Sequence, residues 1–419
     1  MANTLNLGTD GNWATKEGST LAYNDENDNY KPLPFTFTRA SSATVVNKAG
    51  LIETVGNGIP RIDFLGNTQG AFLLEPSRSN FYTQSNLFSF GGNVTSNNSL
   101  SPDGTLNASK ITKTSSSDQF VILPWSASLS TSTTYSLSFF VKHNGDDLDL
   151  RYESNNYNDW GATPIDDGGV SWNALFEVRE NSVIASTVNN CTSNVINFGN
   201  GWYRVVVYVT TSSSITPTSP SNLIRVIGSD TKQFLMYGAM FEQGSCATSY
   251  IPTQGGAVTR SADICNDAGN EQVFNDSEGV LYLEVRASLN IPEGGGGYIT
   301  ISSPSVSFTN ALIIQHRANG QLRVYFGGGG TANIQFLVGS FDWISNNKIA
   351  IQYDSVGSNY KLFVNGVSIS RYGSAANQSV SGLSELNFDY SNINFKGDVK
   401  DVRYYNTSLT DSELAALTS

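Results

Sequence analysis

The sequence predicts an all-β protein, with an extended N-terminal segment followed by two antiparallel β-sandwiches. Apolar residues alternate with polar ones through many short stretches, which is the pattern of half-buried strands. The 39 glycines, together with many Ser, Thr and Asn residues, separate these stretches and favour turns. Only 14% of the residues are charged, so Lys and Glu are too few for a mainly helical chain. The 419 residues are about three times the length of a typical domain, so two or three domains are expected.

Residues 1–83 are predicted to form short strands or extended arms. The apolar pieces FTFT (35–38), GLIETV (50–55) and AFLLEP (71–76) are separated by Gly and Asn turns. Pieces this short are expected to pack onto another structure rather than to fold alone. We therefore assign this region as an attachment segment.

Residues 84–262 are predicted to form the first sandwich, with a jelly-roll-like fold. In YSLSFFV (135–141) and YRVVVYV (203–209), every second residue is a large apolar one, which places these side chains on one face. The strands follow one another without helical periodicity, as in antiparallel sandwiches.

A linker is expected at 263–270, and a second sandwich at 271–419. Strand-like stretches in this second domain include GVLYLEV (279–285) and KIAIQYD (348–354). One short helix is predicted at the end of the chain. Thr410 is its N-cap and Glu413 completes a capping box, while Leu409 and Leu414 can form a hydrophobic staple. All four residues belong to the stretch SLTDSEL (408–414).

The composition excludes several classes of partner. The chain has 24 Lys and Arg against 36 Asp and Glu, a net charge of −12. A nucleic-acid binder needs clustered cations to neutralise phosphates, and an anionic membrane surface attracts basic segments, so both partners are disfavoured. The longest apolar runs are far shorter than the roughly 20 residues that cross a bilayer.

The cysteines and the N-terminus indicate production in a reducing cytoplasm. The three cysteines, Cys191, Cys246 and Cys265, are odd in number and widely spaced, which argues against a disulfide framework. Residues 1–13 have neither the basic flank nor the apolar core of a signal peptide.

The sequence lacks the common catalytic motifs, which predicts that the protein is not an enzyme. The two histidines, His143 and His316, have no HExxH, CxxC or GxSxG motif beside them and are interpreted as surface or edge-strand residues. Glycoside hydrolysis needs two carboxyl groups about 5 to 10 Å apart. The ExDxxE motif that would place them on one strand is absent from the sequence. Carboxylates gathered from separate strands remain the alternative.

No cofactor is assigned, and calcium is left open without a site. Asp25, Asn27 and Asn29 begin an EF-hand-like spacing, but Tyr30 and Thr36 occupy the positions that require Gly and Glu. This loop is therefore interpreted as simply polar.

Two further aspartates sit in turns. Asp103 in SPDG and Asp354 in YDSVG have oxygens that suit a calcium ion. Aspartate at a turn more often caps the backbone, so no metal is assigned to either.

The segment 151–172 is the candidate glycan-binding region. Sugar binding uses aromatic faces that stack on the C–H face of a pyranose, with amides and carboxylates bonding its hydroxyls. The segment offers this mixture in Tyr152, Tyr157, Asp159, Trp160 and Trp172. The competing interpretation is that these aromatic residues are structural, because large rings are usually buried.

Three passages resemble parts of tailed-phage virion proteins. FTRASSATVVNKAGLIETVGNGIPRIDF (37–64), followed by AFLLEPSRSN (71–80), resembles a leader segment found in many of them. FLMYGAMFEQGSCATSYIPTQGGAVTRSAD (234–263), with GNGWYRV upstream, looks like the closing part of a carbohydrate-binding-module-like jelly roll. LFVNGVSIS (362–370) and KDVRYYNTSLTDSELAAL (400–417) resemble the late strands and final helix of a concanavalin A-like, laminin-G-type domain.

This resemblance implies a structural protein of a phage virion, made in the host cytoplasm and exposed on the particle surface. A tail fibre, a tail appendage or a head fibre would dock to other virion proteins through residues 1–83. Its sandwiches would recognise host-surface polysaccharide, and the resemblance favours a homotrimer. Two alternatives are a capsid or neck decoration protein without receptor binding and a polysaccharide depolymerase.

Overall fold

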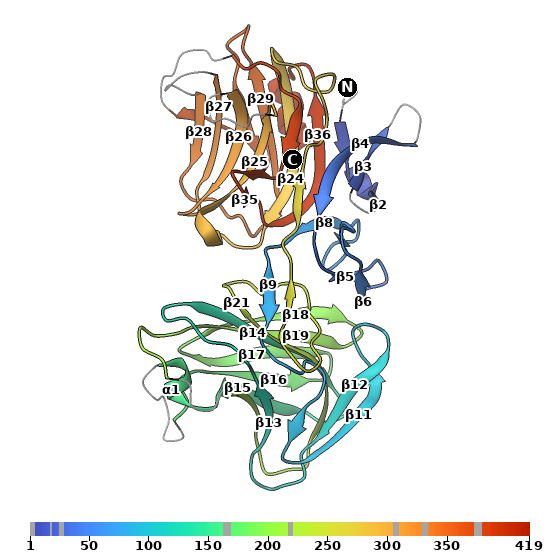
Figure 1. Cartoon of the computed structure of the whole chain (residues 1–419), viewed down its shortest axis with the longest axis vertical. Helices are drawn as coiled ribbons and strands as arrows, with labels where there is room; N and C mark the ends of the chain where they lie inside the picture. Colours follow the sequence, from blue (N-terminus) through green and yellow to red (C-terminus); the bar gives the residue numbers. More distant parts are fainter. Residues whose placement is uncertain are drawn as a thin grey trace. The chain divides into compact units, whose positions relative to one another are not determined.

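A computed structural model describes residues 5–16, 19–24, 29–161, 169–216, 221–304, 310–328, 334–372 and 379–419. The described chain consists almost entirely of antiparallel strands, which confirms the predicted all-β class (Figure 1). It divides into two compact units. Unit 1 comprises Met1–Ser42, Val55–Pro76 and Ser261–Ser419, and unit 2 comprises Ala43–Thr54 and Ser77–Arg260.

This division differs from the predicted boundaries at residues 83 and 263. The segment 1–83 is not a separate part of the fold, because its strands are shared between the sheets of the two units. The expected linker 263–270 contains a strand, Ile264–Asn266, that pairs with residues 36–38. Short strands leave their backbone N–H and C=O groups unpaired unless they join a sheet, which explains why these pieces are built into larger structures.

Unit 1 is a sandwich of two eight-stranded sheets within the described residues. The first sheet has the order β31-β30-β29-β24-β36-β8-β7, with β1 also paired to β36. Its strands are β1 (Leu5–Leu7), β7 (Ile62–Asp63), β8 (Ala71–Leu74), β24 (Glu278–Ala287), β29 (Asn347–Asp354), β30 (Lys361–Val364), β31 (Val367–Ile369) and β36 (Gly397–Tyr405).

The second sheet of unit 1 has the order β32-β28-β27-β26-β25-β35-β34, with β33 paired to β25. Its strands are β25 (Gly296–Ser302), β26 (Asn310–Arg317), β27 (Leu322–Gly328), β28 (Ile334–Val338), β32 (Arg371–Tyr372), β33 (Glu385–Asn387), β34 (Asp389–Tyr390) and β35 (Ile393–Asn394). A smaller sheet contains β2 (Ala14–Lys16), β3 (Ser19–Asn24), β4 (Asn29–Thr38) and β23 (Ile264–Asn266). Short 3₁₀ turns are present at η1 (Thr9–Gly11) and η2 (Glu293–Gly295).

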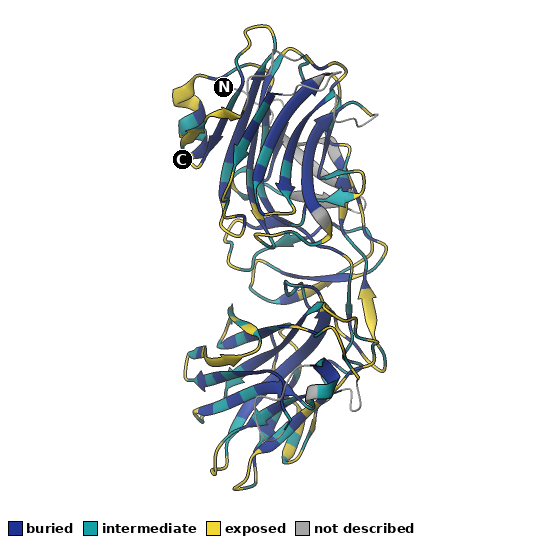
Figure 2. Ribbon diagram, turned by 90° about the vertical axis from the view of Figure 1, so that its left-hand side faces the viewer, coloured by how far each residue is buried: buried dark blue, intermediate teal, exposed yellow. Residues whose placement is uncertain are grey.

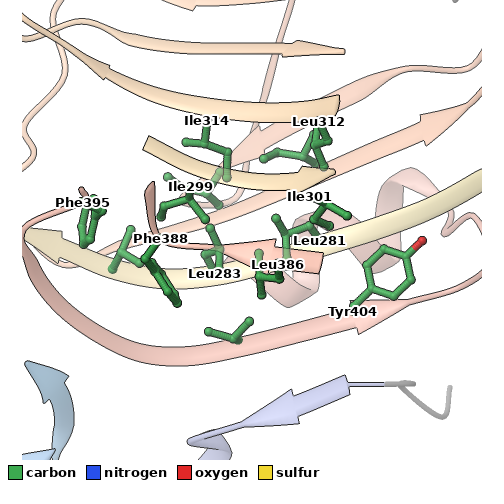
Figure 3. Packing of buried hydrophobic residues seen from close by; sticks show 14 of the residues in the cluster. Leu281, Leu283, Ile299, Ile301, Leu312, Ile314, Leu386, Phe388, Phe395 and Tyr404 are labelled. Atoms are coloured by element: carbon green, nitrogen blue, oxygen red, sulfur yellow. The ribbon is translucent and has the colours of Figure 1, made fainter. Parts of the chain in front are cut away.

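The core of unit 1 lies between its two large sheets. Figure 3 shows the facing side chains from β24, β25, β26 and β36, among them Leu281, Ile299, Leu312 and Tyr404. Residues from the N-terminal region complete this core, namely Leu5, Leu7, Phe35, Phe37, Phe72 and Leu74. The burial of these six side chains is the physical reason why the predicted attachment segment belongs to the sandwich.

The predicted C-terminal helix is present as α2 (Asp411–Thr418), and its capping box is confirmed. The Glu413 amide donates to Thr410 Oγ1 at 3.3 Å, and the Thr410 amide donates to Glu413 Oε2 at 2.8 Å. Leu409 and Leu414 are buried in the same cluster, so one side of the helix packs on the first sheet while the other is exposed (Figure 2).

Unit 2 contains two six-stranded sheets within the described residues. The first has the order β10-β13-β20-β15-β16-β17, with β10 (Ser89–Phe90), β13 (Gln119–Pro124), β15 (Leu148–Ser154), β16 (Asn173–Arg179), β17 (Ser182–Asn189) and β20 (Ser221–Val226). The second has the order β11-β12-β21-β14-β19-β18, with β11 (Asn93–Leu100), β12 (Leu106–Thr112), β14 (Thr134–His143), β18 (Thr192–Gly199), β19 (Trp202–Thr210) and β21 (Gln233–Gln243). Short additions are β5 (Ala43–Val46) with β6 (Ile52–Val55), β9 (Arg78–Asn80) with β22 (Val258–Arg260), and α1 (Tyr157–Trp160).

One outer face of unit 2 is covered by the chain itself. Ser136 Oγ, on β14, donates to the Cys246 carbonyl at 3.3 Å. Arg204 Nη1, on β19, donates to the Thr248 carbonyl at 2.6 Å. The residues after β21 therefore lie over the outer side of the second sheet, and Ser136 and Arg204 are buried beneath them.

The outer side of the first sheet carries half-buried or exposed side chains along its strands. We call this side the open face, and its outward-pointing residues include Phe120, Ile122, Arg151, Leu175, Leu223 and Arg225.

Candidate functional site

The predicted glycan-binding residues need correction, because four of them are in the core of unit 2. Tyr152, Asp159, Trp160 and Trp172 have relative exposures of 0%, 0%, 1% and 1%. The rings of Trp160 and Trp172 lie edge to face at 5.6 Å, and the hydroxyls of Tyr152 and Tyr82 are 2.6 Å apart. A ring enclosed by other rings presents no free surface to a sugar. Tyr152, Trp160 and Trp172 are therefore structural aromatic residues.

The fifth predicted residue, Tyr157, is the first residue of α1. Its side chain lies outside the described residues, as do residues 162–168 of the same segment.

The same segment does border a pocket, but through other residues. The pocket has a volume of about 380 Å³ and lies on the open face of unit 2. Between β13 and β20, Phe120 pairs with Arg225 and Ile122 pairs with Leu223. On the other side of β20, Leu223 pairs with Glu153 of β15. These outward positions on β13, β20 and β15 are joined at the rim by Ser154, Asn155 and Val170.

A buried carboxylate between two guanidinium groups forms the polar side of the pocket. Glu153 Oε1 accepts from Arg225 Nη2 at 2.8 Å and Nε at 3.0 Å, and Glu153 Oε2 is 2.6 Å from Arg151 Nε. Burial alone would lower the pKa of Arg225, but the hydrogen bond and charge of Glu153, with help from Asp118, raise it. Arg225 Nη1 also lies 3.4 Å from Asp118 Oδ2, so the charges of the two arginines are balanced by Glu153 and Asp118.

The apolar side of the pocket is formed by Phe120, Ile122 and Leu223. The guanidinium carbon of Arg225 lies 4.9 Å from the centre of the Phe120 ring, so the ring holds the cation in place. Asn155 Nδ2 donates to Ser221 Oγ at 3.0 Å, which fixes the amide at the rim. The pocket thus offers apolar surface beside a few fixed donors and acceptors, as small-molecule sites do.

Two strand sequences contain a signal for this pocket. In QFVILP (119–124) and SNLIRV (221–226), large side chains occur on both faces of the strand rather than on one. A strand of this kind has one set of side chains for the core and a second set on the other side. Phe120, Leu223 and Arg225 belong to that second set.

The two histidines differ from each other in burial. His143 Nε2 is 3.3 Å from Asp147 Oδ1, and its side chain is partly exposed. His316 is only 4% exposed and lies on β26, which is paired with β25 on one side and β27 on the other. The interpretation as a surface or edge-strand residue is therefore wrong for His316. Burial lowers the pKa of His316 to about 4, because the charged form is disfavoured in the protein interior.

The turn aspartates act as caps. Asp103 Oδ1 accepts from the Thr105 amide at 2.7 Å and from Ser101 Oγ at 2.6 Å. Burial alone would raise the pKa of Asp103, but hydrogen bonds from Ser101, Thr105 and Asn107 outweigh it and lower the pKa to about 2. Asp354 Oδ1 accepts from the Gly357 amide at 2.6 Å.

Across the described ranges, no group of three or more His, Cys, Asp and Glu side chains is placed to hold a metal ion. Asp25 and Asn27 of the EF-hand-like spacing lie outside those ranges, and the side chain of Asn29 does too. Calcium therefore has no assigned site among the residues described. Among the described residues, no helix is long and apolar enough to span a bilayer.

No protein-family model matches the chain, and no curated protein matches it. Solved structures with similarity include the CBM40 module of the Ruminococcus gnavus IT-sialidase bound to α2,3-sialyllactose, at 14% identity over 37% of this chain and 94% of that one, with a TM-score of 0.30. Mouse laminin α1 domains LG4-5 are 11% identical over 69% of this chain and 86% of theirs, with a TM-score of 0.23. Trypanosoma rangeli sialidase is 10% identical over 95% of this chain and 65% of its own, with a TM-score of 0.28.

Proposed function

We propose that the protein is a non-enzymatic glycan-recognition protein and that the open face of unit 2 is its binding surface. The observation that carries this proposal is the pocket of about 380 Å³ on that face. It combines the apolar side chains of Phe120, Ile122 and Leu223 with fixed polar groups at its rim. The other outer face of unit 2 is occupied by the chain's own residues 246–248, which leaves the open face as the binding surface of this unit in the proposal.

A sugar ring has C–H groups that prefer apolar contact and hydroxyls that both donate and accept. Ile122, which is 43% exposed, and Phe120 offer the apolar contact. Arg225 offers donors and the Asn155 amide offers an acceptor oxygen, so one ring can satisfy both kinds of group in this pocket. Single-ring contacts of this kind are weak, and several copies of the chain would convert them into firm attachment.

Binding without catalysis is supported by the state of Glu153. Both of its oxygens are already engaged, one by Arg225 and the other by Arg151. Glycoside hydrolysis needs one carboxyl group that gives a proton and a second that attacks the sugar or activates water. A carboxylate held by two guanidinium groups suits neither task.

We also propose that the chain is a component of a tailed-phage particle, as a tail fibre, tail appendage or head fibre, present as a homotrimer. This proposal is supported by the resemblance of residues 37–64, 71–80 and 234–263 to phage virion proteins. The strands of residues 1–83 are integrated into the two units, so contacts to other virion proteins would be made by the folded units. Light scattering on the purified chain tests the trimer, and a density map of the particle tests its location.

The glycan proposal is tested with immobilised bacterial surface polysaccharides from a panel of hosts. Retention of the wild-type chain on at least one polysaccharide is expected. The variants Phe120→Ala and Asn155→Ala are each expected to weaken retention about tenfold, since each removes on the order of 1.4 kcal/mol of contact. The matched control is Ile184→Ala on β17, which is exposed on the same sheet but does not line the pocket.

Each outcome decides between the alternatives. Unchanged retention in both pocket variants would remove the open face as the binding surface. Shortened polysaccharide after incubation would show a depolymerase, and the absence of both retention and cleavage across the panel would favour a decoration protein. Thermal unfolding of each variant shows that a loss of retention does not come from a loss of fold.

A further inference from the structure

Unit 1 has a pocket of its own, with a volume of about 230 Å³. Its floor is formed by neighbouring strands of the first sheet, where Arg286 on β24 is directly opposite Asp398 on β36. One wall is the turn 63–67 between β7 and β8, and the other is the turn 344–346 before β29. All of these residues belong to unit 1, so the pocket is complete within that unit.

The floor presents fixed hydrogen-bonding groups. Arg286 Nε donates to Asp398 Oδ2 at 2.8 Å, and Nη2 of the same guanidinium bonds the same oxygen. The Arg286 side chain is 47% exposed, and its guanidinium carries five N–H donors, so donors remain for a ligand. Lys400 Nζ, also at the pocket, is 3.8 Å from Glu284 Oε1, a distance that leaves its ammonium only loosely held.

An amide in the wall needs a partner that the protein does not supply. Asn67 Nδ2 is buried and has no hydrogen-bond partner within the described part of the chain. The backbone amide of Asn67 donates to the Phe64 carbonyl at 3.2 Å, so the turn holds this residue in position. A buried donor without an acceptor costs about 1–3 kcal/mol. A rotation of the half-buried Asn67 side chain that brings Nδ2 to an oxygen of a bound molecule would remove that cost.

The charge of the lining residues and the volume of the pocket limit the kind of molecule that can bind in it. Arg286 and Lys400 are balanced by Asp63 and Asp398, so the lining has no net charge and attracts neither a polyanion nor a metal cation. The pocket is smaller than the ~300–1,000 Å³ of sites for drug-sized molecules. Its mixed donors and acceptors, with apolar surface from Leu65 and the 51% exposed Ile344, match one ring with several hydroxyls.

We propose that this pocket binds one neutral saccharide ring. The site is separate from the open face of unit 2, and its ligand contacts come from different strands, so each site can be present without the other. A chain with both sites would hold two points on a polysaccharide, which raises its avidity beyond that of either site.

The test uses methyl glycosides of glucose, galactose, mannose and N-acetylglucosamine as probes, added to the full chain. Saturation-transfer NMR gives the affinity, and hydrogen exchange shows where protection appears. We expect millimolar binding of at least one glycoside, with new protection at residues 63–67 and 344–346. Asn67→Leu and Lys400→Met are each expected to lower the affinity about tenfold, because each removes one hydrogen-bond donor.

Lys361→Met is the matched control, since Lys361 pairs with Asp411 and does not line the pocket. Both Asn67→Leu and Lys400→Met are measured, so that a folding defect in one of them does not decide the result. Thermal unfolding of each variant identifies such a defect. The proposal is overturned if no glycoside binds, if both variants bind as the wild type does, or if methyl glucuronide binds tenfold more tightly than every neutral glycoside. The variant Phe120→Ala separates the two sites: it should reduce polysaccharide retention while leaving the protection at 63–67 unchanged.

Discussion

The imidazole of His316 stacks on the indole of Trp343, with ring centroids 4.2 Å apart and planes 22° apart. On its other side, His316 Nε2 is 2.8 Å from the Asn290 carbonyl oxygen. A carbonyl only accepts, so Nε2 carries a proton. Because burial lowers the pKa to about 4, Nδ1 carries none at pH 7 and the ring is neutral. The pKa of about 4 reflects this buried, uncharged state.

This burial predicts that unit 1 loses stability in mild acid. The folded-state pKa of about 4 is below the ordinary value of 6.5, so the unfolded chain binds the proton first as the pH falls. The stabilisation is therefore present above about pH 6.5 and is lost between pH 6.5 and pH 4. Between pH 7 and pH 5 the loss is expected to be about 2 kcal/mol. Hydrogen exchange of the β24 and β26 amides measures it for unit 1 alone.

In His316→Gln this loss between pH 7 and pH 5 should shrink relative to the wild type, because the titrating ring is gone while the side-chain amide can still donate to Asn290. His143→Gln provides the control, since His143 is in unit 2 and its replacement should leave the β24 and β26 amides unaffected. An equal pH dependence in wild type and His316→Gln would mean that another group causes the acid sensitivity.

Trp160→Ala is expected to destabilise unit 2 by about 3–5 kcal/mol, because it empties a fully enclosed site. The Trp160 ring contacts Trp172, Tyr135 and Phe241, with ring centroids 5.6 to 6.0 Å apart. Urea unfolding followed by the near-ultraviolet circular dichroism of the aromatic core gives the change. The exposed substitution Ile184→Ala should change the free energy of unfolding by less than about 1 kcal/mol. A Trp160→Ala chain as stable as that control would show that the indole is not a core residue.

Asp263→Asn is expected to destabilise unit 1 by about 3–5 kcal/mol. Asp263 Oδ1 accepts from Arg39 Nη1 at 3.1 Å, its Oδ2 pairs with Arg61, and both arginines are buried. Neutralising the carboxylate removes the negative charge beside two buried guanidinium groups. Arg61 still has Glu75 at 2.7 Å, and Arg39 still donates to the Ser41 and Gly56 carbonyls. Chemical denaturation followed by exchange of the β8 amides measures the effect.

The control for this network is the exposed pair of Lys361 and Asp411. Exposed ion pairs contribute about 0–1 kcal/mol, so Asp411→Asn should have a small effect. If Asp263→Asn and Asp411→Asn destabilise unit 1 equally, the ion pairs of Asp263 with Arg39 and Arg61 do not stabilise unit 1 more than an exposed pair does.

The class of fold could be predicted from the sequence because alternation sets which side of a strand is buried. Tyr135, Leu137, Phe139 and Val141 are all buried as their spacing predicted, and the Thr410 capping box is present. Such local patterns depend on neighbouring residues only, so one sequence is enough to find them.

The domain boundaries and the site depend on pairing between distant residues, which local patterns do not contain. Nothing near Leu5 indicates that it pairs with Tyr404, and nothing near Arg61 indicates that Asp263 neutralises it. The same limit applies to Trp160, whose polar neighbours suggested a surface loop although the ring is enclosed by other aromatic residues. A charged residue inside an apolar motif, as in IPRIDF and AFLLEP, is the signal that a buried partner exists elsewhere.

The antiparallel pairing of β1 with β36 has a consequence for biosynthesis. Leu5 is translated 399 residues before Tyr404, its partner in the sheet (404 − 5 = 399). At about 5–20 residues per second, the first strand waits roughly 20–80 s before its neighbour is translated. During this time unit 2 can complete its sheets, because all of its residues precede 261. Strand β1 therefore waits for its final neighbour with its apolar residues unpaired, which makes it a target for chaperones that shield apolar strands.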